Sequence, residues 1–191
     1  MRVAGRVAAV GIGVALLLQS GAAIGDVLKR ADPVGDVWRT PIGSSSYAPA
    51  PTRVEGDIVS SRVSHGPHAI WIGIRLRDLT TTSNGLFARL AIVSDRRYRA
   101  IAIDALPGHW DGRSVTTTRA GLVVGCGVTH RIDYDENRIV VRVPRVCLGR
   151  HPAWVRVAIR TTVAGTKYAY TDDARTTGLV SRVVFGHRVR R

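Results

Sequence analysis

The chain has 191 residues, and its 28 lysines and arginines against 14 acidic residues give it a formal net charge of +14. This length suffices for one domain with a hydrophobic core and leaves little room for two. Such a charge draws an exported protein toward anionic surfaces such as cell-wall polymers, anionic lipid or nucleic acid, although an arginine-rich composition is also typical of GC-rich genomes.

The N-terminus has the pattern of a secretion signal. Arg2 and Arg6 form a positive start, residues 7–18 are an uncharged apolar run, and small residues at 20–23 suit cleavage. The apolar run is about 12 residues long, whereas a membrane-spanning helix needs about 20. We therefore expect residues 1–23 to be a signal peptide and the mature protein to be secreted, extracellular or in the cell envelope, with no transmembrane segment after signal removal. An uncleaved anchor is the alternative.

Residues 24–53 are predicted to be an irregular N-terminal arm. Four prolines and the serines at 44–46 disfavour both helix and strand there. The arm's distinctive feature is the stretch Asp-Pro-Val-Gly-Asp at residues 32–36, which places two carboxylates on a stiff corner.

Residues 54–186 alternate polar and apolar side chains with the period of two that is typical of strands. The clearest strand spans residues 68–79 and should form a hairpin with residues 57–65 across a Gly-Pro turn. We expect one face of this hairpin to be buried, with Ile70, Ile72, Ile74 and Leu76 beside Val59 and Val63. Further strands are predicted at 86–94, 98–104, 114–119, 122–129, 131–134, 138–143, 154–162, 167–171 and 179–185.

No segment after the leader has a convincing helical period. Many short strands joined by tight turns indicate an all-β fold, and we predict one antiparallel β-sandwich of jelly-roll or immunoglobulin-like type. Residues 187–191 are predicted to be a short, frayed basic tail.

Cys126 and Cys147 are the only cysteines. In an exported protein an even pair is most simply a disulfide, which would stabilise the fold by roughly 3 kcal/mol in the chain-entropy model. A metal or redox pair is the alternative, but it lacks Cys-x-x-Cys spacing and neighbouring ligands.

The corner at residues 32–36 has three interpretations. Proline and glycine suit a simple turn, and two carboxylates on a rigid corner suit Ca²⁺. A catalytic pair is the third, although no nucleophile or histidine lies close by. Because Ca²⁺ takes about six to eight oxygens, other acids must contribute, and Asp172 and Asp173 follow a predicted strand. If the first and last strands are neighbours, all four aspartates meet; otherwise each pair caps a turn or binds Arg39 or Arg175.

The stretch DPVGDV, followed by GDIVSSRVSH and AIWIGIRLRDL, resembles the opening of exported bacterial sandwich domains of the DOMON-like and family 9 carbohydrate-binding type. The Pro-x-x-Cys-Leu-Gly corner at 144–149 is similar to one in small exported proteins with a single cysteine pair. The resemblance implies a ligand- or sugar-binding sandwich with structural Ca²⁺ held by Asp32 and Asp36, and extends to Asp57. The chain departs from the carbohydrate-binding pattern because only 6% of its residues are aromatic.

Candidate ligand-binding residues lie on the polar faces of two predicted strands. Trp71 and Trp154 are either exposed platforms for sugars or part of a second buried face. Basic residues alternate along the same strands, as Arg75 and Arg77 in one and Arg156 and Arg160 in the other. On one sheet these would bind a cell-wall glycan, another polyanion or nucleic acid; a solvated polar face is the alternative.

Motifs for catalysis are weak. Residues 109–114 contain His, Asp and Ser, but catalytic triads assemble from distant segments, and the chain has no Gly-x-Ser-x-Gly elbow and no P-loop. We therefore predict a non-catalytic binding or scaffold protein, with a hydrolase of unrecognised type as the alternative.

Overall fold

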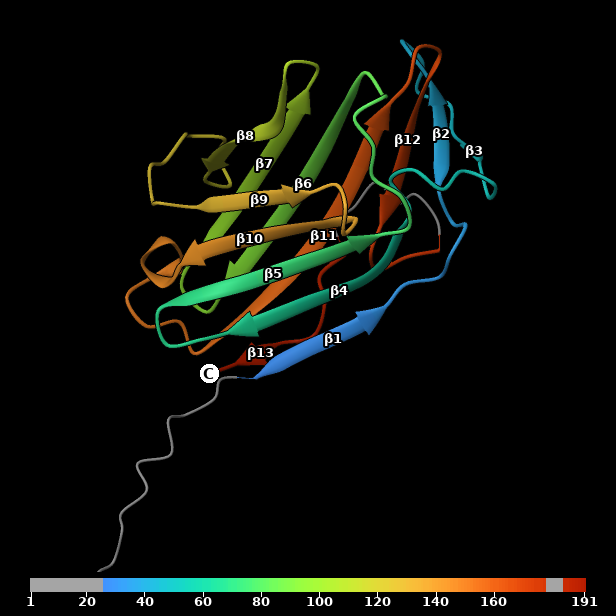
Figure 1. Ribbon diagram of the computed structural model, residues 1–191. Helices are drawn as coiled ribbons and strands as arrows, with labels where there is room; N and C mark the ends of the chain where they lie inside the picture. Colours follow the sequence, from blue (N-terminus) through green and yellow to red (C-terminus); the bar gives the residue numbers. More distant parts are fainter. Residues whose placement is uncertain (1–25, 178–183) are drawn as a thin grey trace, which may run out of the picture.

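The chain folds into two antiparallel sheets that pack face to face (Figure 1). The computed structural model describes residues 26–177 and 184–191. The predicted signal peptide and most of the predicted strand at 179–185 lie outside these residues. Within them, the only helical segment is a single 3₁₀ turn, η1 (Arg145–Leu148), and no helix is long and apolar enough to cross a membrane. The predicted all-β sandwich is confirmed.

One sheet has five strands in the order β1-β4-β5-β10-β9. Their bounds are β1 (Val27–Ala31), β4 (Ile58–His65), β5 (Ala69–Leu76), β9 (Thr129–Asp133) and β10 (Arg138–Pro144). The predicted hairpins β4–β5 and β9–β10 form as expected. One burial prediction was wrong. The register shifts between Ile58 and Ser60, so that Ile58 is fully buried and Val59 is only partly buried.

The other sheet has eight strands in the order β3-β2-β12-β11-β6-β7-β8, with β13 paired to β11. Their bounds are β2 (Trp38–Pro41), β3 (Ala48–Pro49), β6 (Gly85–Ser94), β7 (Tyr98–Leu106), β8 (His109–Thr117), β11 (Trp154–Ala164), β12 (Tyr168–Asp173) and β13 (Val189–Arg190). The predicted strand at 122–129 is wrong, because only an isolated bridge between Thr117 and Val123 forms before β9 begins at Thr129.

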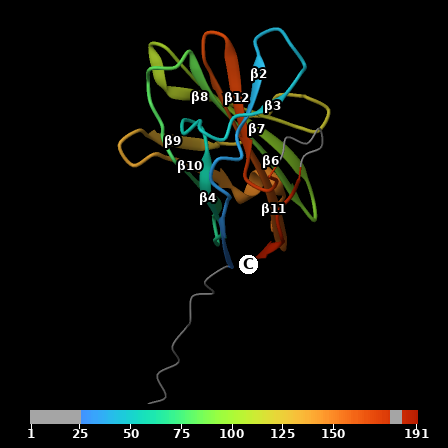
Figure 2. The same cartoon turned by 90° about the vertical axis from the view of Figure 1, so that its right-hand side faces the viewer.

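The arm and the tail are more ordered than the sequence suggested. The arm supplies β1, β2 and β3, and the tail supplies β13. Pro41 and Pro49 are compatible with strands because each stands at the last residue of a short strand near a sheet edge. The arm also crosses between the layers, since β1 pairs with β4 in one sheet and β2 with β12 in the other (Figure 2).

The core lies between the facing sides of the sheets. On β5, the side chains of Ile70, Ile72 and Ile74 are fully buried and that of Leu76 is nearly so, as predicted. Aliphatic residues of β10, β11, β6 and β7 belong to the same cluster. Burying one such side chain stabilises the fold by about 1.5–3 kcal/mol, so the apolar faces of these strands contribute much of the stability of the sandwich.

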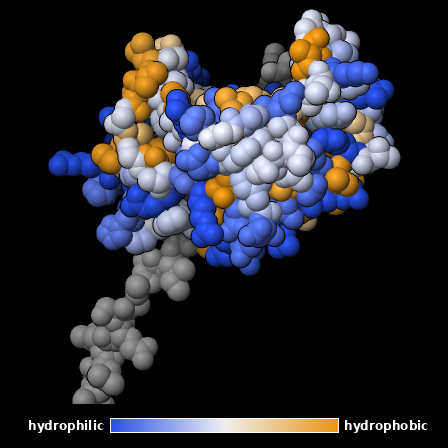
Figure 3. All heavy atoms as spheres, turned by 45° about the horizontal axis from the view of Figure 1, so that its top comes forward, coloured by the Kyte–Doolittle hydropathy of each residue, from blue (hydrophilic) through white to orange (hydrophobic). Residues whose placement is uncertain are grey.

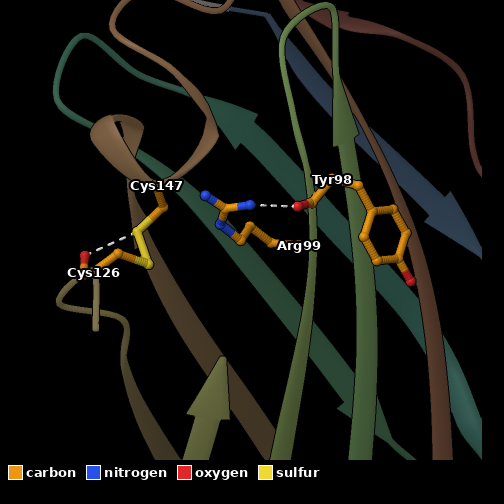
Figure 4. Close-up of a disulfide and its surroundings, with 4 residues drawn as sticks. All are labelled: Tyr98, Arg99, Cys126 and Cys147. Atoms are coloured by element: carbon orange, nitrogen blue, oxygen red, sulfur yellow. Dashed lines mark hydrogen bonds between the residues drawn. A yellow bond between two sulfur atoms is a disulfide. The ribbon is translucent and has the colours of Figure 1, made fainter. Parts of the chain in front are cut away.

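The predicted disulfide between Cys126 and Cys147 is confirmed, with 5.3 Å between the two Cα atoms. It joins the segment after β8 to η1 and lies close to Arg99 of β7, which donates a hydrogen bond to the Tyr98 carbonyl at 2.7 Å (Figure 4). A disulfide indicates that the protein resides in an oxidising compartment.

Candidate metal centre

Five aspartates gather where the arm crosses from one sheet to the other. Asp32 follows β1, Asp36 stands just before β2, Asp57 directly precedes β4, and Asp172 and Asp173 end β12. We call these five residues the acid cluster. Its members come from both sheets and from chain positions far apart, so they meet only through strand pairing.

The turn between Asp32 and Asp36 depends on its glycine. Gly35 has a φ of +84°, and a Cβ there would lie 2.9 Å from the Pro51 carbonyl oxygen. Its backbone N–H donates a hydrogen bond to Asp57 Oδ2 at 2.9 Å. The stiff corner predicted from the sequence is thus anchored to the start of β4.

Three of the aspartates are arranged as metal ligands. Asp32, Asp36 and Asp172 each present a carboxylate oxygen, and these oxygens all lie within 4.8 Å of one another. Asp172 is held from both sides, since its Oδ2 accepts the Ile58 N–H at 2.6 Å and its Oδ1 accepts the Asp173 N–H at 2.7 Å. These three residues could hold a metal ion.

Asp32 is the most poorly satisfied member of the cluster. It is 7% exposed, yet neither of its carboxylate oxygens has a hydrogen-bond partner, and the same holds for both oxygens of the less buried Asp36. One oxygen each of Asp57 and Asp173 is also without a partner. A buried charge without partners costs several kcal/mol, which a bound cation would offset.

The pKa values of the five aspartates are all raised, as expected for buried carboxylates with too few partners. Burial, with the charges of Asp172 and Asp36, raises the pKa of Asp32 to about 8. Burial also raises the pKa of Asp172 to about 7, against the backbone hydrogen bond from Ile58. The pKa values of Asp36, Asp57 and Asp173 are likewise raised, in each case mainly by burial.

Positive side chains neutralise one rim of the cluster. Arg77 lies 3.5 Å from Asp57, and Arg160 lies 3.1 Å from Asp173. The pKa of the buried Arg175 is lowered by burial, although the nearby charges of Asp32 and Asp173 oppose this shift. Within the described part of the chain, the three metal-ligand candidates Asp32, Asp36 and Asp172 take part in no ion pair.

The cluster suits ion binding better than turnover of a large substrate. Asp32 and Asp172 are only 7% and 2% exposed, which leaves little room for contact with a ligand as large as a sugar or a peptide. An ion is small enough to occupy such a buried site.

The predicted ligand-binding residues fall in three places. Trp71 and Arg75 lie on the outer face of the five-stranded sheet, and Trp154 lies on the eight-stranded sheet, with Arg188 over its ring. Arg77 directly follows β5 and is exposed, and its guanidinium lies 3.5 Å from Asp57 Oδ2. The arginines of these two strands form no single basic surface, since β5 and β11 belong to different sheets.

Asp57 and its partner Arg77 show what sequence reasoning assigned incompletely. Asp57 entered only through the family resemblance, and Arg77 was assigned to a binding face. The predicted β4–β5 hairpin could have shown that Asp57 and Arg77 are neighbours, because Asp57 directly precedes β4 and Arg77 directly follows β5. In the structure the Arg77 backbone N–H donates to the Asp57 carbonyl at 2.7 Å. Within a hairpin, residues just outside the two strands are neighbours.

In comparisons with protein-family models, curated proteins and solved structures, the chain has no significant match.

Proposed function

We propose that this protein is an exported, non-catalytic binding or scaffold protein, in which a structural Ca²⁺ ion at the acid cluster holds the arm on the sandwich. The main support for the metal site is the burial of Asp32, whose two carboxylate oxygens have no hydrogen-bond partner and which lies beside Asp36 and Asp172. The leader pattern and the disulfide support export.

The donor set favours Ca²⁺ among the common ions. All candidate ligands are carboxylate oxygens, which suit hard cations. Mg²⁺ demands near-octahedral geometry and usually retains several waters, whereas Ca²⁺ accepts irregular loops such as this corner. Extracellular Ca²⁺ modules bind with dissociation constants of about 10⁻⁴–10⁻³ M, which suits an exported protein.

Thermal melting of the mature protein tests this proposal. If Kd is about 10⁻⁴–10⁻³ M, as in other extracellular Ca²⁺ modules, about 10 mM Ca²⁺ stabilises the fold by about 1.4–2.7 kcal/mol, which raises Tm by about 3–10 °C. We expect a smaller rise with Mg²⁺ and none in EGTA.

The double variant Asp32→Asn/Asp36→Asn should lose the Ca²⁺ response. Its matched control is Asp111→Asn/Asp135→Asn, which makes the same change at two exposed aspartates and should keep the response. A Tm that is unchanged by Ca²⁺ in the wild-type protein would leave the corner as a simple turn.

A basic surface that binds an anionic polymer is the second candidate function. The distribution of charge on the five-stranded sheet favours it.

A further inference from the structure

The outer face of the five-stranded sheet carries a concentration of positive charge. We call it the basic face, and its cations come from all five strands: Lys29, Arg62, Arg75, Arg131, Arg138 and Arg142. The register places them in adjoining rows, since Lys29 pairs with Arg62, and Arg138 pairs with Arg75. Neighbouring strands are about 4.8 Å apart and alternate residues about 7 Å apart, a spacing on the scale of one or two sugar units.

Much of this charge is not neutralised by the protein. Arg131 pairs with Asp133 and Arg138 with Glu136, each at 2.8 Å. The other cations of the basic face, Lys29, Arg62, Arg75 and Arg142, form no ion pair within the described ranges. The surface is therefore electrostatically complementary to an anionic partner.

The basic face also has a shaped hollow at its centre. Gly73 of β5 lacks a side chain, so the surrounding side chains enclose a depression of about 270 Å³. Trp71, Arg62, Arg75, Arg138, Val140 and the hydroxyl-bearing Ser60 and Ser64 line it. Trp71 is 46% exposed, and the Arg142 guanidinium lies over its ring, 5.9 Å from the centroid.

Resting on the proposed binding function, we propose that the basic face binds an acidic polysaccharide, with one sugar ring packed on Trp71 in the hollow over Gly73. The carboxylate or sulfate groups of the chain pair with Arg62, Arg75 and the neighbouring cations, because a guanidinium can donate two parallel hydrogen bonds to such a group. The indole face provides a flat apolar surface for the C–H groups of the sugar.

The shape of the face favours a polysaccharide over nucleic acid. Proteins that bind single strands stack successive bases on several aromatic residues, whereas the hollow offers only Trp71. Duplex readers insert a helix or ribbon into a groove, and here the charged surface is the face of a sheet. Figure 3 shows hydrophilic residues over much of the molecule's visible surface, while hydrophobic residues are concentrated on the upper left projection and scattered elsewhere.

The test measures binding of the mature, disulfide-bonded protein to a hyaluronan dodecasaccharide by calorimetry. Chitin oligosaccharides of similar length serve as the uncharged comparison, and an oligothymidylate serves as the nucleic-acid comparison. We expect saturable binding to hyaluronan that weakens as salt increases, and weaker binding to both comparison ligands.

Paired charge variants distinguish the basic face from net charge. Arg62→Gln/Arg75→Gln should weaken hyaluronan binding by about tenfold and make it less sensitive to salt. Arg39→Gln/Arg113→Gln removes the same charge from the eight-stranded sheet and should leave affinity nearly unchanged.

Gly73→Val tests the hollow without weakening the fold. A Cβ at this position would lie 4.0 Å from its nearest neighbour, the Arg62 Cβ, so the side chain fits in the space that the ligand would use. Because valine favours strands more than glycine does, Tm should be equal or higher. We expect Gly73→Val and Trp71→Ala to weaken hyaluronan binding.

Three results would overturn the proposal: an equal loss in the control pair, unchanged affinity in Gly73→Val, or tighter binding to oligothymidylate. The proposed Ca²⁺ site is tested separately with the double variant Asp32→Asn/Asp36→Asn. That variant should lose the Ca²⁺ effect on Tm and keep hyaluronan binding.

Discussion

At the scale of single residues, the aspartates of the acid cluster differ in how well the protein satisfies them. Asp172 accepts backbone N–H groups at both oxygens, and Asp57 accepts one from Gly35 and faces Arg77. Asp32 has no hydrogen-bond donor despite its burial. Asp32 is therefore the aspartate that a bound cation would stabilise most. Without a cation, its pKa of about 8 favours the protonated carboxyl at neutral pH.

The pH dependence of stability should reflect this state. The pKa of Asp32 is raised from 3.8 to about 8 in the folded protein, so the folded state binds more protons than the unfolded state between these values. The contribution of Asp32 to the stability of the fold is therefore fully present below its unfolded pKa of 3.8. It is lost as the pH rises through its folded pKa of about 8. In EGTA, we expect Asp32→Asn to reduce by about 2 kcal/mol or more the loss of unfolding free energy between pH 5 and pH 8.5.

Urea denaturation at the two pH values, with Asp111→Asn as the control, measures this effect. Ca²⁺ should abolish the loss in the wild-type protein. An identical pH dependence in wild type and Asp32→Asn would show that this carboxyl is not perturbed.

At the scale of elements, β5 has two separate roles on its two faces. Its inward side chains, such as Ile72 and Ile74, are fully buried in the core. Its outward residues Trp71, Gly73 and Arg75 form the centre of the basic face. The strand period of two separates the buried face from the exposed face, so stability and the proposed binding can be changed independently.

Substitutions on the two faces of β5 should therefore differ in how much they lower the free energy of unfolding. Ile72→Ala should lower the unfolding free energy by about 2–5 kcal/mol, because it leaves a cavity in a closely packed core. Arg75→Gln, on the exposed face of the same strand, should change it by less than about 0.5 kcal/mol. Urea denaturation measures both, and a loss of similar size in the two variants would contradict the assignment of the faces.

At the scale of the whole molecule, the acid cluster lies where the two sheets come together at one edge. The crossing between β1 and β2 supplies Asp32 and Asp36, while β12 and the start of β4 supply the remaining members. An ion there would bridge both layers and the arm. The core and the disulfide stabilise the rest of the sandwich without it.

Hydrogen exchange should reveal this division. The amide of Asp32 donates to Val59 at 3.1 Å, and that of Ile58 donates to Asp172 at 2.6 Å. We expect both amides to exchange faster in EGTA than in Ca²⁺, because the crossing opens more often without the ion. Amides between β6 and β7 should exchange at the same rate in both conditions, and a uniform change across the molecule would contradict a local role.

Strand alternation, turn residues and the cysteine pair were enough to predict the sandwich, the hairpins around β5 and β10, and the disulfide. These signals are local, since burial of one face imposes a period of two and Gly-Pro or Asp-Glu-Asn segments favour turns. The same local rules failed for the arm, where prolines argued against strands. Pairing at a sheet edge tolerates a proline at the end of a strand, and only the tertiary structure shows where the edges are.

The sequence by itself identified two acidic pairs and a set of alternating arginines, but not which of them are neighbours. The tertiary structure decided that Asp32 and Asp36 meet Asp172, with Asp57 alongside. It also decided that Arg75 joins Arg62 and Arg138, whereas Arg156 belongs to the other sheet. The physical reason is that partners far apart in sequence are chosen by core packing and strand register, which depend on the whole chain.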